Sequence, residues 1–213
     1  MTASGRASRP VAAETRTRNA RGEGERLRAA LMEAAAELML EHGSAERLSI
    51  RSITARAGVS PTALYLHFVD KEELLRAVSG EAFEELGRYM REAASVHAGD
   101  ARAQLRAMGE AYIRFAQERP GHYRILFATP GRVAASVPAG PSDADAGTRA
   151  LQQLVHSTAA CVGEDRDPEA VAYQLWTGLH GYLTLRSVMT GLAWPSGEEF
   201  LGELFAAHVE RLR

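Results

Sequence analysis

The chain has 213 residues, 46% of them hydrophobic and 24% charged, and its formal net charge of −2 at pH 7 fits a globular chain that buries a sizeable core in one or two domains. Charged residues or glycines interrupt its apolar runs well before the roughly 18 residues that a membrane span needs, and no apolar segment follows the N-terminal arginines as it would in a secretory signal. Its single cysteine, Cys161, excludes an intrachain disulfide framework, so we expect a cytoplasmic protein without a membrane partner.

Residues 1–24 are predicted to be a disordered basic arm, because they contain few apolar side chains. The arm belongs to a basic half: residues 1–70 carry ten arginines and eight acidic residues, whereas residues 71–213 carry fifteen basic and nineteen acidic residues. This separation concentrates affinity for DNA at one end of the molecule. The arm itself is either a solvated tail or a segment that reaches phosphates or the minor groove.

From residue 25 the sequence is helical, with an apolar stripe that Gly43 ends. Residues 48–75 then place two short helical patterns around a tight turn at Gly58. Ser60 is predicted to cap the second helix, with Pro61 at its first position and Phe68 near its end. The spacing is typical of a helix-turn-helix, whose second helix enters the DNA major groove, although an ordinary pair of packed helices has the same pattern.

The remainder of the chain is predicted to contain long helices. Asp70, Asp100, Asp167 and Ser196 are the start signals, and Pro120 ends one helix before a short apolar segment, 122–127. Residues 129–147 are predicted to form a long flexible loop. The predicted helices of this part cover 71–94, 100–119, 148–162, 168–190 and 196–212. No stretch alternates with the period of a strand, so we expect an all-α fold of about nine helices.

Enzyme signatures are missing from the sequence. His156 and Cys161 are five residues apart, which places them on different faces of one helix, and no two histidines have the spacing of a helical metal pair. There is no glycine-rich phosphate loop and no G-x-S-x-G motif. We therefore predict no catalytic residues, no metal and no cofactor. A purely structural helical adaptor remains an alternative, but it leaves Arg51, Tyr65 and His67 without a role.

The run LSIRSITARAGVSPTALYLHFVDKEELL, preceded by LMEAAAELMLEHG, resembles the DNA-binding domain of TetR-type (tetracycline-repressor-like) transcriptional regulators. The resemblance covers about the first 75 residues. It implies a helix-turn-helix domain at 25–70 and a ligand-binding and dimerisation domain at 71–213. It also implies a homodimeric regulator, most commonly a repressor, that binds a palindromic double-stranded DNA operator and releases it when a small-molecule effector binds.

The resemblance also implies which residues contact DNA. Arg51 stands where the first helix of the motif reaches a base, and Lys71 stands where the fourth helix contacts a phosphate. The positions implied to face DNA are Arg51, Ser60, Thr62, Ala63, Tyr65, His67 and Lys71. Because Pro61-Thr62-Ala63 replaces the polar or glycine-containing triplet of many relatives, the operator sequence cannot be transferred from them.

Two further sets of residues follow from the expected ligand-binding domain, in which WTGLHGYLTLR, 176–186, resembles a subgroup marked by a Trp and a His-Gly pair. The large or polar residues expected to line an effector pocket are Tyr112, Phe115, His122, Tyr123, Phe127, Trp176 and His180. The residues expected at the dimer interface, on the last two helices, are Leu175, Leu179, Tyr182, Phe200, Leu204 and His208. For each pocket residue, simple packing in the core is the alternative.

Overall fold

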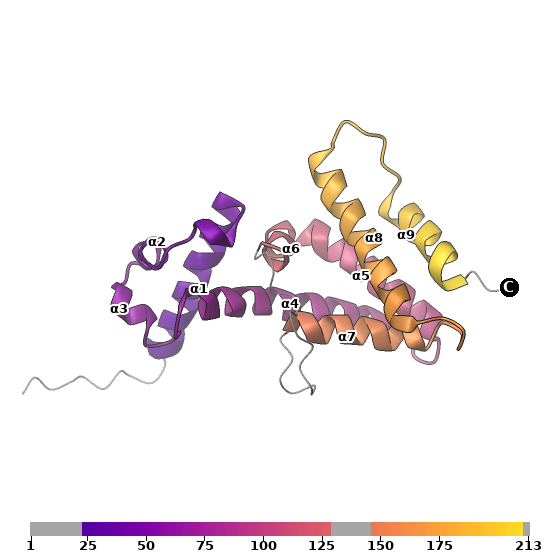
Figure 1. The fold of residues 1–213 in the computed structure, drawn as a ribbon, viewed down its shortest axis with the longest axis horizontal. Coiled ribbons are helices and arrows are strands. Elements are labelled where there is room, and N and C mark those ends of the chain that lie inside the picture. Colours follow the sequence, from indigo (N-terminus) through magenta and orange to yellow (C-terminus); the bar gives the residue numbers. More distant parts are fainter. Residues whose placement is uncertain (1–22, 129–145, 211–213) are drawn as a thin grey trace, which may run out of the picture.

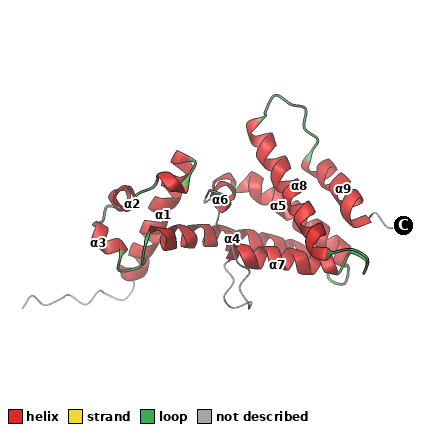
Figure 2. Ribbon diagram, viewed as in Figure 1, coloured by secondary structure: helices red, strands yellow, loops and turns green. Residues whose placement is uncertain are grey.

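The computed structural model describes residues 23–128 and 146–210, and these ranges contain helices and no strands (Figure 2). The α-helices are α1 Glu23–His42, α2 Ile50–Arg56, α3 Pro61–Leu64, α4 Lys71–Ser95, α5 Ala101–Glu118, α6 Pro120–Leu126, α7 Ala146–Ala159, α8 Pro168–Val188 and α9 Gly197–Phe205. A 3-10 turn, Ala45–Arg47, and a π-helical turn, Ala206–Glu210, complete them. The predicted all-α class is confirmed. None of the helices in the described ranges combines the length and apolar character of a membrane-spanning helix.

The helix starts depend on local capping. The Asp70 side chain accepts a hydrogen bond from the Glu73 backbone N–H at 2.6 Å, and Asp100 accepts one from Ala103 at 3.0 Å, as predicted. Ser196 and Glu199 form the predicted reciprocal capping box of α9. These bonds satisfy backbone donors that a helix leaves unpaired at its first turn. Ser60 occupies the cap position of α3, but its side chain makes no capping hydrogen bond.

Three predicted boundaries are wrong. Glu23 and Gly24, expected in the arm, begin α1, and residues 1–22 lie outside the described residues. Of the predicted loop, residues 129–145 also lie outside them, whereas Ala146 and Gly147 are buried at the start of α7. A Cβ on Gly147 would lie 3.2 Å from the Phe83 ring, so the glycine lets α7 approach α4 closely. The predicted helix 61–68 stops at Leu64.

The helices form two parts joined by α4 (Figure 1). Helices α1, α2 and α3 gather at one end, which we call the head, and α5 to α9 form the body at the other. α4 runs from the head along the body, with α5 and α7 packed beside it. Its first turns bury Leu74 and Leu75 next to the head, and its later turns bury Leu86 and Met90 in the body. One continuous helix therefore contributes to the packing of both parts.

Candidate functional site

The head is a small helical unit with a sharp turn between α2 and α3. Gly58 has a φ of 70°, which is the backbone conformation that the reversal requires and that glycine adopts without strain. Ile53 of α2 and Leu64 of α3 are fully buried, and Phe68 is 3% exposed. Because both short helices bury their apolar side chains on the same core, α3 is held in a fixed orientation on the surface of the head.

An ion-pair network fixes α2 against α1. The Arg56 guanidinium lies 2.9 Å from a Glu37 carboxylate oxygen and 2.8 Å from one of Glu41. Its hydrogen bond to Glu41 lowers the pKa of that carboxyl group below its ordinary value. The three side chains are partly exposed, so the network contributes more to orientation than to stability.

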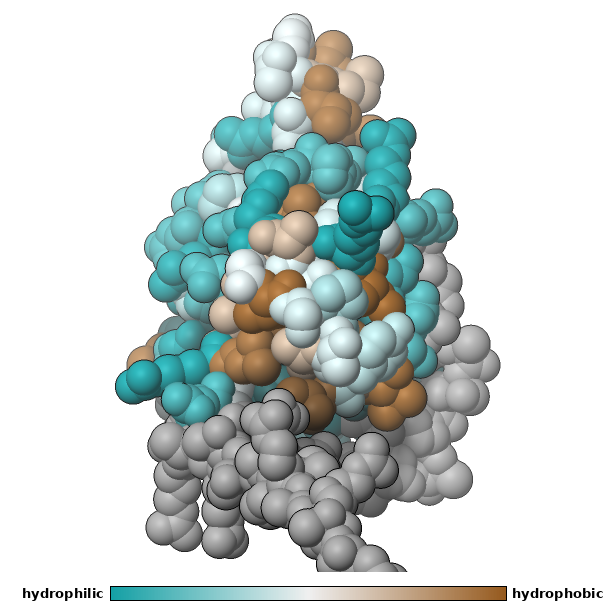
Figure 3. Space-filling view, turned by 90° about the vertical axis from the view of Figure 1, so that its left-hand side faces the viewer, coloured by the Kyte–Doolittle hydropathy of each residue, from teal (hydrophilic) through white to brown (hydrophobic). Residues whose placement is uncertain are grey.

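Four of the seven residues implied to contact DNA are exposed on α2, on α3 or at the two caps of α3. Arg51, Ser60 and Thr62 are exposed, and Tyr65 is 56% exposed. Figure 3 faces this end of the molecule and shows hydrophobic residues scattered among hydrophilic ones. A surface with cationic, hydroxyl and aromatic groups can meet both phosphates and base edges.

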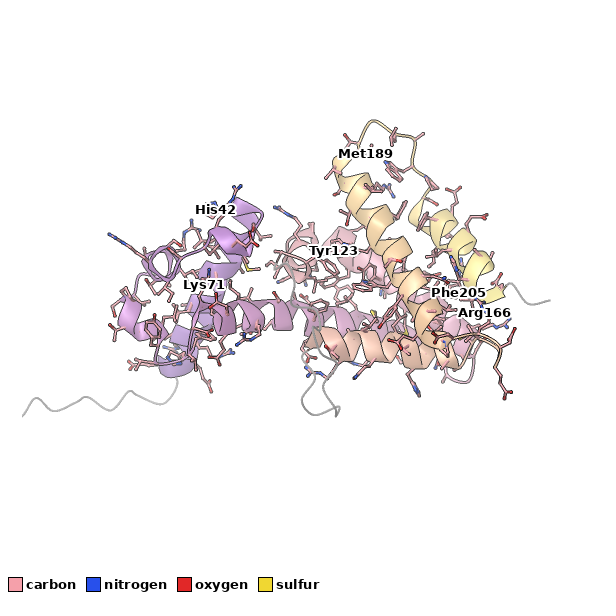
Figure 4. All side chains as sticks on the ribbon, viewed as in Figure 1. His42, Lys71, Tyr123, Arg166, Met189 and Phe205 are labelled. Carbon is pink, nitrogen blue, oxygen red and sulfur yellow. The ribbon has the colours of Figure 1, made fainter. Side chains whose placement is uncertain are left out.

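The other three residues implied to contact DNA are partly enclosed by the protein. Ala63 is half-buried. His67 follows the end of α3 and turns toward α1, where its Cε1 atom lies 3.4 Å from the position of a Cβ on Gly24. The Lys71 ammonium donates a hydrogen bond to the Leu48 carbonyl at 3.0 Å (Figure 4). Lys71 therefore ties the start of α4 to the segment before α2, whereas the buried Nε2 atom of His67 has no hydrogen-bond partner among the described residues.

The body contains an apolar cavity of about 60 Å³ between α4, α5, α7 and α8. Of the seven expected pocket residues, Tyr112, Phe127 and Trp176 line it. Most of its other lining residues are aliphatic or small, and they include Leu86, Met90, Leu105, Met108, Ala150, Leu151, Leu154, Leu175 and Leu179. The sequence does not single out these residues, because a leucine in a cavity wall has the same periodicity as one in a core, and the predicted set contains only aromatic residues and histidines.

The other four expected pocket residues lie elsewhere. Phe115 is fully buried with its ring edge-on to Tyr89, at 5.3 Å between ring centroids. His122 is on the surface, where its Nδ1 atom lies 3.2 Å from a Glu85 carboxylate oxygen. The prediction that these two residues line the cavity is wrong. Tyr123 and His180 lie on its outer side, in a neighbouring cleft.

Five of the expected dimer residues pack within the protomer. Leu175, Leu179 and Tyr182 are 2%, 6% and 3% exposed. The Phe200 ring stacks on Tyr182 with centroids 4.3 Å apart, and a Cβ on Gly178 would lie 2.8 Å from a Leu204 methyl carbon.

His208, the sixth expected dimer residue, is half-buried, and its carbonyl accepts a hydrogen bond from Arg166. The apolar side chains that α8 and the following turn leave exposed are instead Tyr173, Leu185, Val188, Met189 and Leu192. The inner face of α8 is thus occupied by its own core, and the surface open to a second copy lies mainly near its C-terminal end.

The tyrosine and histidine side chains near the cavity have perturbed protonation. Burial raises the pKa of Tyr112 well above its ordinary value, and it raises that of Tyr123. Burial lowers the pKa of His180, because desolvation disfavours the charged imidazole. Within the described ranges, no three His, Cys, Asp or Glu side chains are grouped to hold a metal ion. The arrangement can bind ligands by apolar contact and hydrogen bonding.

Comparison with known proteins places both parts of the chain. Residues 31–78 match the bacterial regulatory proteins of the tetR family, and residues 105–212 match the tetracyclin repressor-like C-terminal domain. A solved TetR family transcription regulator from Marinobacter aquaeolei VT8 is 21% identical with a TM-score of 0.65, and the match covers 88% of this chain and 98% of that one.

Two other solved structures share the fold. A protein of unknown function from Rhodococcus sp. RHA1 is 24% identical with a TM-score of 0.65, covering 87% of this chain and 95% of that one. SmeT, the repressor of the Stenotrophomonas maltophilia multidrug efflux pump SmeDEF, is 19% identical with a TM-score of 0.61, covering 86% and 91%. The chain belongs to the TetR family of bacterial regulatory proteins, which are ligand-responsive, DNA-binding transcription regulators.

Proposed function

We propose that this regulator is a repressor that binds a palindromic operator as a homodimer and leaves it when an apolar small molecule enlarges the cavity of the body. The observation that carries the proposal is the double role of α4. This helix begins in the head at Lys71, and its residues Phe83, Leu86 and Met90 line the cavity. A molecule that fills the cavity therefore presses on the helix that carries the DNA-binding surface.

A second contact joins the head to the body. The Arg124 guanidinium of α6 donates a hydrogen bond to the Leu40 carbonyl of α1 at 3.0 Å, and the Ala45 N–H donates one to the Ala128 carbonyl at 3.3 Å. Phe127, next to Ala128, lines the cavity. The head is thus connected to the body covalently through α4 and by hydrogen bonds to α6 and Ala128. A shift of the cavity-lining residues can therefore change the position of the head through both connections.

The effect of an effector on DNA binding is set by its preference between two conformations. Two recognition helices of a dimer must enter successive major grooves about 34–36 Å apart. An effector lowers operator affinity only if it binds more tightly to a conformation in which that spacing is lost. By linkage, the operator must weaken the effector by the same factor, typically about 5- to 150-fold.

We assign the DNA contacts to a DNA-binding domain, 25–70, and the effector site and the dimer surface to a second domain, 71–213. Arg51, Thr62 and Tyr65 are proposed to contact the operator, with Arg51 reading a guanine. Ser60 caps α3 and Ala63 lies on it, and His67 and Lys71 are further proposed contacts at the edge of this surface. The dimer surface is proposed to form around Leu185, Val188, Met189 and Leu192. The protein acts in the cytoplasm, and it binds without catalysing a reaction.

The test is a coupled binding experiment. A thermal-shift screen of apolar compounds identifies a molecule that stabilises the protein, and fluorescence anisotropy then measures operator affinity with and without it. We expect the compound to weaken operator binding, and the operator to weaken compound binding by the same factor. Identical compound affinities with and without operator would contradict the proposal. A compound that tightens operator binding would show a co-repressed regulator instead.

A further inference from the structure

The cavity is separated by one aromatic wall from a larger cleft between the head and the body. The cleft has a volume of about 730 Å³ and lies between α6, α8 and the end of α1. Figure 4 shows Tyr123, one of its lining residues, between the two parts of the molecule. Phe127 lines both the cavity and the cleft. One side chain therefore stands between the apolar cavity and a larger cleft whose lining is partly polar.

The Phe127 ring packs in a cluster of aromatic side chains, and it is edge-on to Phe83 with the ring centroids 6.1 Å apart. Its centroid lies 4.1 Å from that of His180, 5.8 Å from that of Tyr123 and 6.3 Å from that of Trp176. The residue is half-buried and follows the last residue of α6. None of these contacts is a hydrogen bond or an ion pair, and a ligand that spans the cavity and the cleft has to displace this ring.

The aromatic residues between the cavity and the cleft carry hydrogen-bonding atoms, to which a purely apolar ligand could not bond. The Tyr123 hydroxyl and the His180 Nδ1 atom are hydrogen-bonded at 2.8 Å. The Tyr112 ring packs edge-on to Tyr123, with centroids 5.8 Å apart, and lines the cavity. Its buried hydroxyl makes no hydrogen bond of normal geometry to a described residue, although it lies close enough to the Tyr123 and Trp176 side chains for both to affect its pKa. An unpaired buried hydroxyl destabilises the empty protein, and a ligand acceptor placed beside it removes that penalty.

The charged side chains that line the cleft are all positive. Its lining includes Arg124 and Arg186, and none of the described residues that line it is acidic. Arg124 uses one nitrogen on the Leu40 carbonyl, and Arg186 uses one on the Tyr182 hydroxyl. A guanidinium carries five N–H donors, so both side chains keep donors for a further acceptor. A cleft with cations and no acidic residue in its lining favours an anion.

We propose that the effector is an amphipathic carboxylate: its apolar chain fills the cavity, and its carboxylate lies beside the aromatic residues that separate the cavity from the cleft, where the Tyr112 hydroxyl donates a hydrogen bond and the two arginines supply the attraction. The inference rests on the proposed function, because it names the chemical class of the effector at the same site. It assigns Tyr112 as the residue that distinguishes an acid from a neutral chain of the same length.

The experiment compares two probes of equal chain length, decanoate and decan-1-ol, on the full chain by isothermal titration calorimetry. We expect decanoate to bind at least about tenfold more tightly, because hydrogen bonds to a charged acceptor are stronger than those to a hydroxyl. The preference should shrink as sodium chloride is raised, because the arginines are exposed to solvent.

Variants identify the residues that make the protein prefer decanoate to decan-1-ol. Tyr112→Phe should abolish most of it without weakening decan-1-ol, and the variant should fold because it removes an unpaired polar group. Arg186→Gln should reduce it, whereas Arg102→Gln, an exposed arginine outside the cleft, should leave it unchanged. Equal affinities for the two probes, binding of neither, or a preference that survives both Tyr112→Phe and Arg186→Gln would overturn the inference.

The same samples separate this inference from the proposed function. Release of operator by a neutral apolar compound, with no response to decanoate, refutes the carboxylate and leaves the repressor mechanism standing. If decanoate binds with the expected preference but operator affinity is unchanged in its presence, the ligand class is right and the release mechanism is wrong.

Discussion

Filling the cavity from α7 should stabilise the protein and remove its response to an effector. Ala150 lines the cavity and is half-buried. The substitution Ala150→Leu places an apolar side chain in a space of about 60 Å³. Alanine and leucine have similar helix propensities, so α7 itself should be little affected.

The size of the effect follows from the cavity volume. Empty apolar space costs a folded protein about 24 cal/mol per Å³. For 60 Å³, complete filling would raise the free energy of unfolding by about 1.4 kcal/mol. In a chain of 213 residues this corresponds to a rise in melting temperature of about 3–5 °C. It is an upper limit, because a leucine fills the space imperfectly and crowds its neighbours.

The assay combines thermal unfolding at a fixed protein concentration with operator anisotropy. Ala159→Leu, at an exposed position of the same helix, is the matched control and should change neither quantity. We expect Ala150→Leu to keep operator affinity while an effector found by thermal-shift screening no longer lowers it. A loss of more than about 1 kcal/mol would show that the space cannot accept a side chain. An unchanged effector response would show that effectors bind elsewhere.

Three further predictions concern the operator, the dimer and pH. Arg51→Ala should weaken operator binding by about 1–3 kcal/mol while leaving binding to random DNA nearly unchanged, and an equal loss on both would make Arg51 a phosphate contact. Val188→Glu, at a residue that is 70% exposed, should give folded monomers in sedimentation with weak operator binding, whereas Leu179→Glu buries a charge and should unfold the chain. If Val188→Glu still forms dimers, the dimer interface lies elsewhere on the protein. Because burial lowers the pKa of His180 below its ordinary value of 6.5, the free energy of unfolding should be highest above pH 6.5 and fall as the pH drops from there toward the lowered pKa. His180→Gln should flatten that part of the denaturation profile, and an unchanged slope would assign it to other groups.

Local features of the fold were predictable from the sequence because they depend on neighbouring residues. Asp70 and Asp100 cap the helices that follow them, and Gly58 has the positive φ of the turn between α2 and α3. The length of α3 was not predictable, because Leu64 and Phe68 have helical spacing although the chain leaves the helix between them. Both side chains are buried in either geometry, so periodicity does not distinguish a helix from a turn here.

The positions of the candidate site residues depend on tertiary contacts, which the periodicity of the sequence does not predict. α8 is apolar around most of its surface, and the sequence alone does not say which side faces the core and which faces a partner. The close approach of Leu204 to Gly178 and the stacking of Phe200 on Tyr182 settle the inner side. In the same way, the position of His122 on the surface follows from its contact with Glu85, a residue 37 positions away.

Selection of random double-stranded DNA by the purified full-length protein shows whether the protein recognises an operator as a dimer. We expect enrichment of an inverted repeat whose half-sites lie one helical turn apart, about 10–10.5 base pairs between centres, and salt-dependent binding of the dimer to this duplex. Enrichment of a single unpaired half-site, or of no sequence at all, would contradict this expectation.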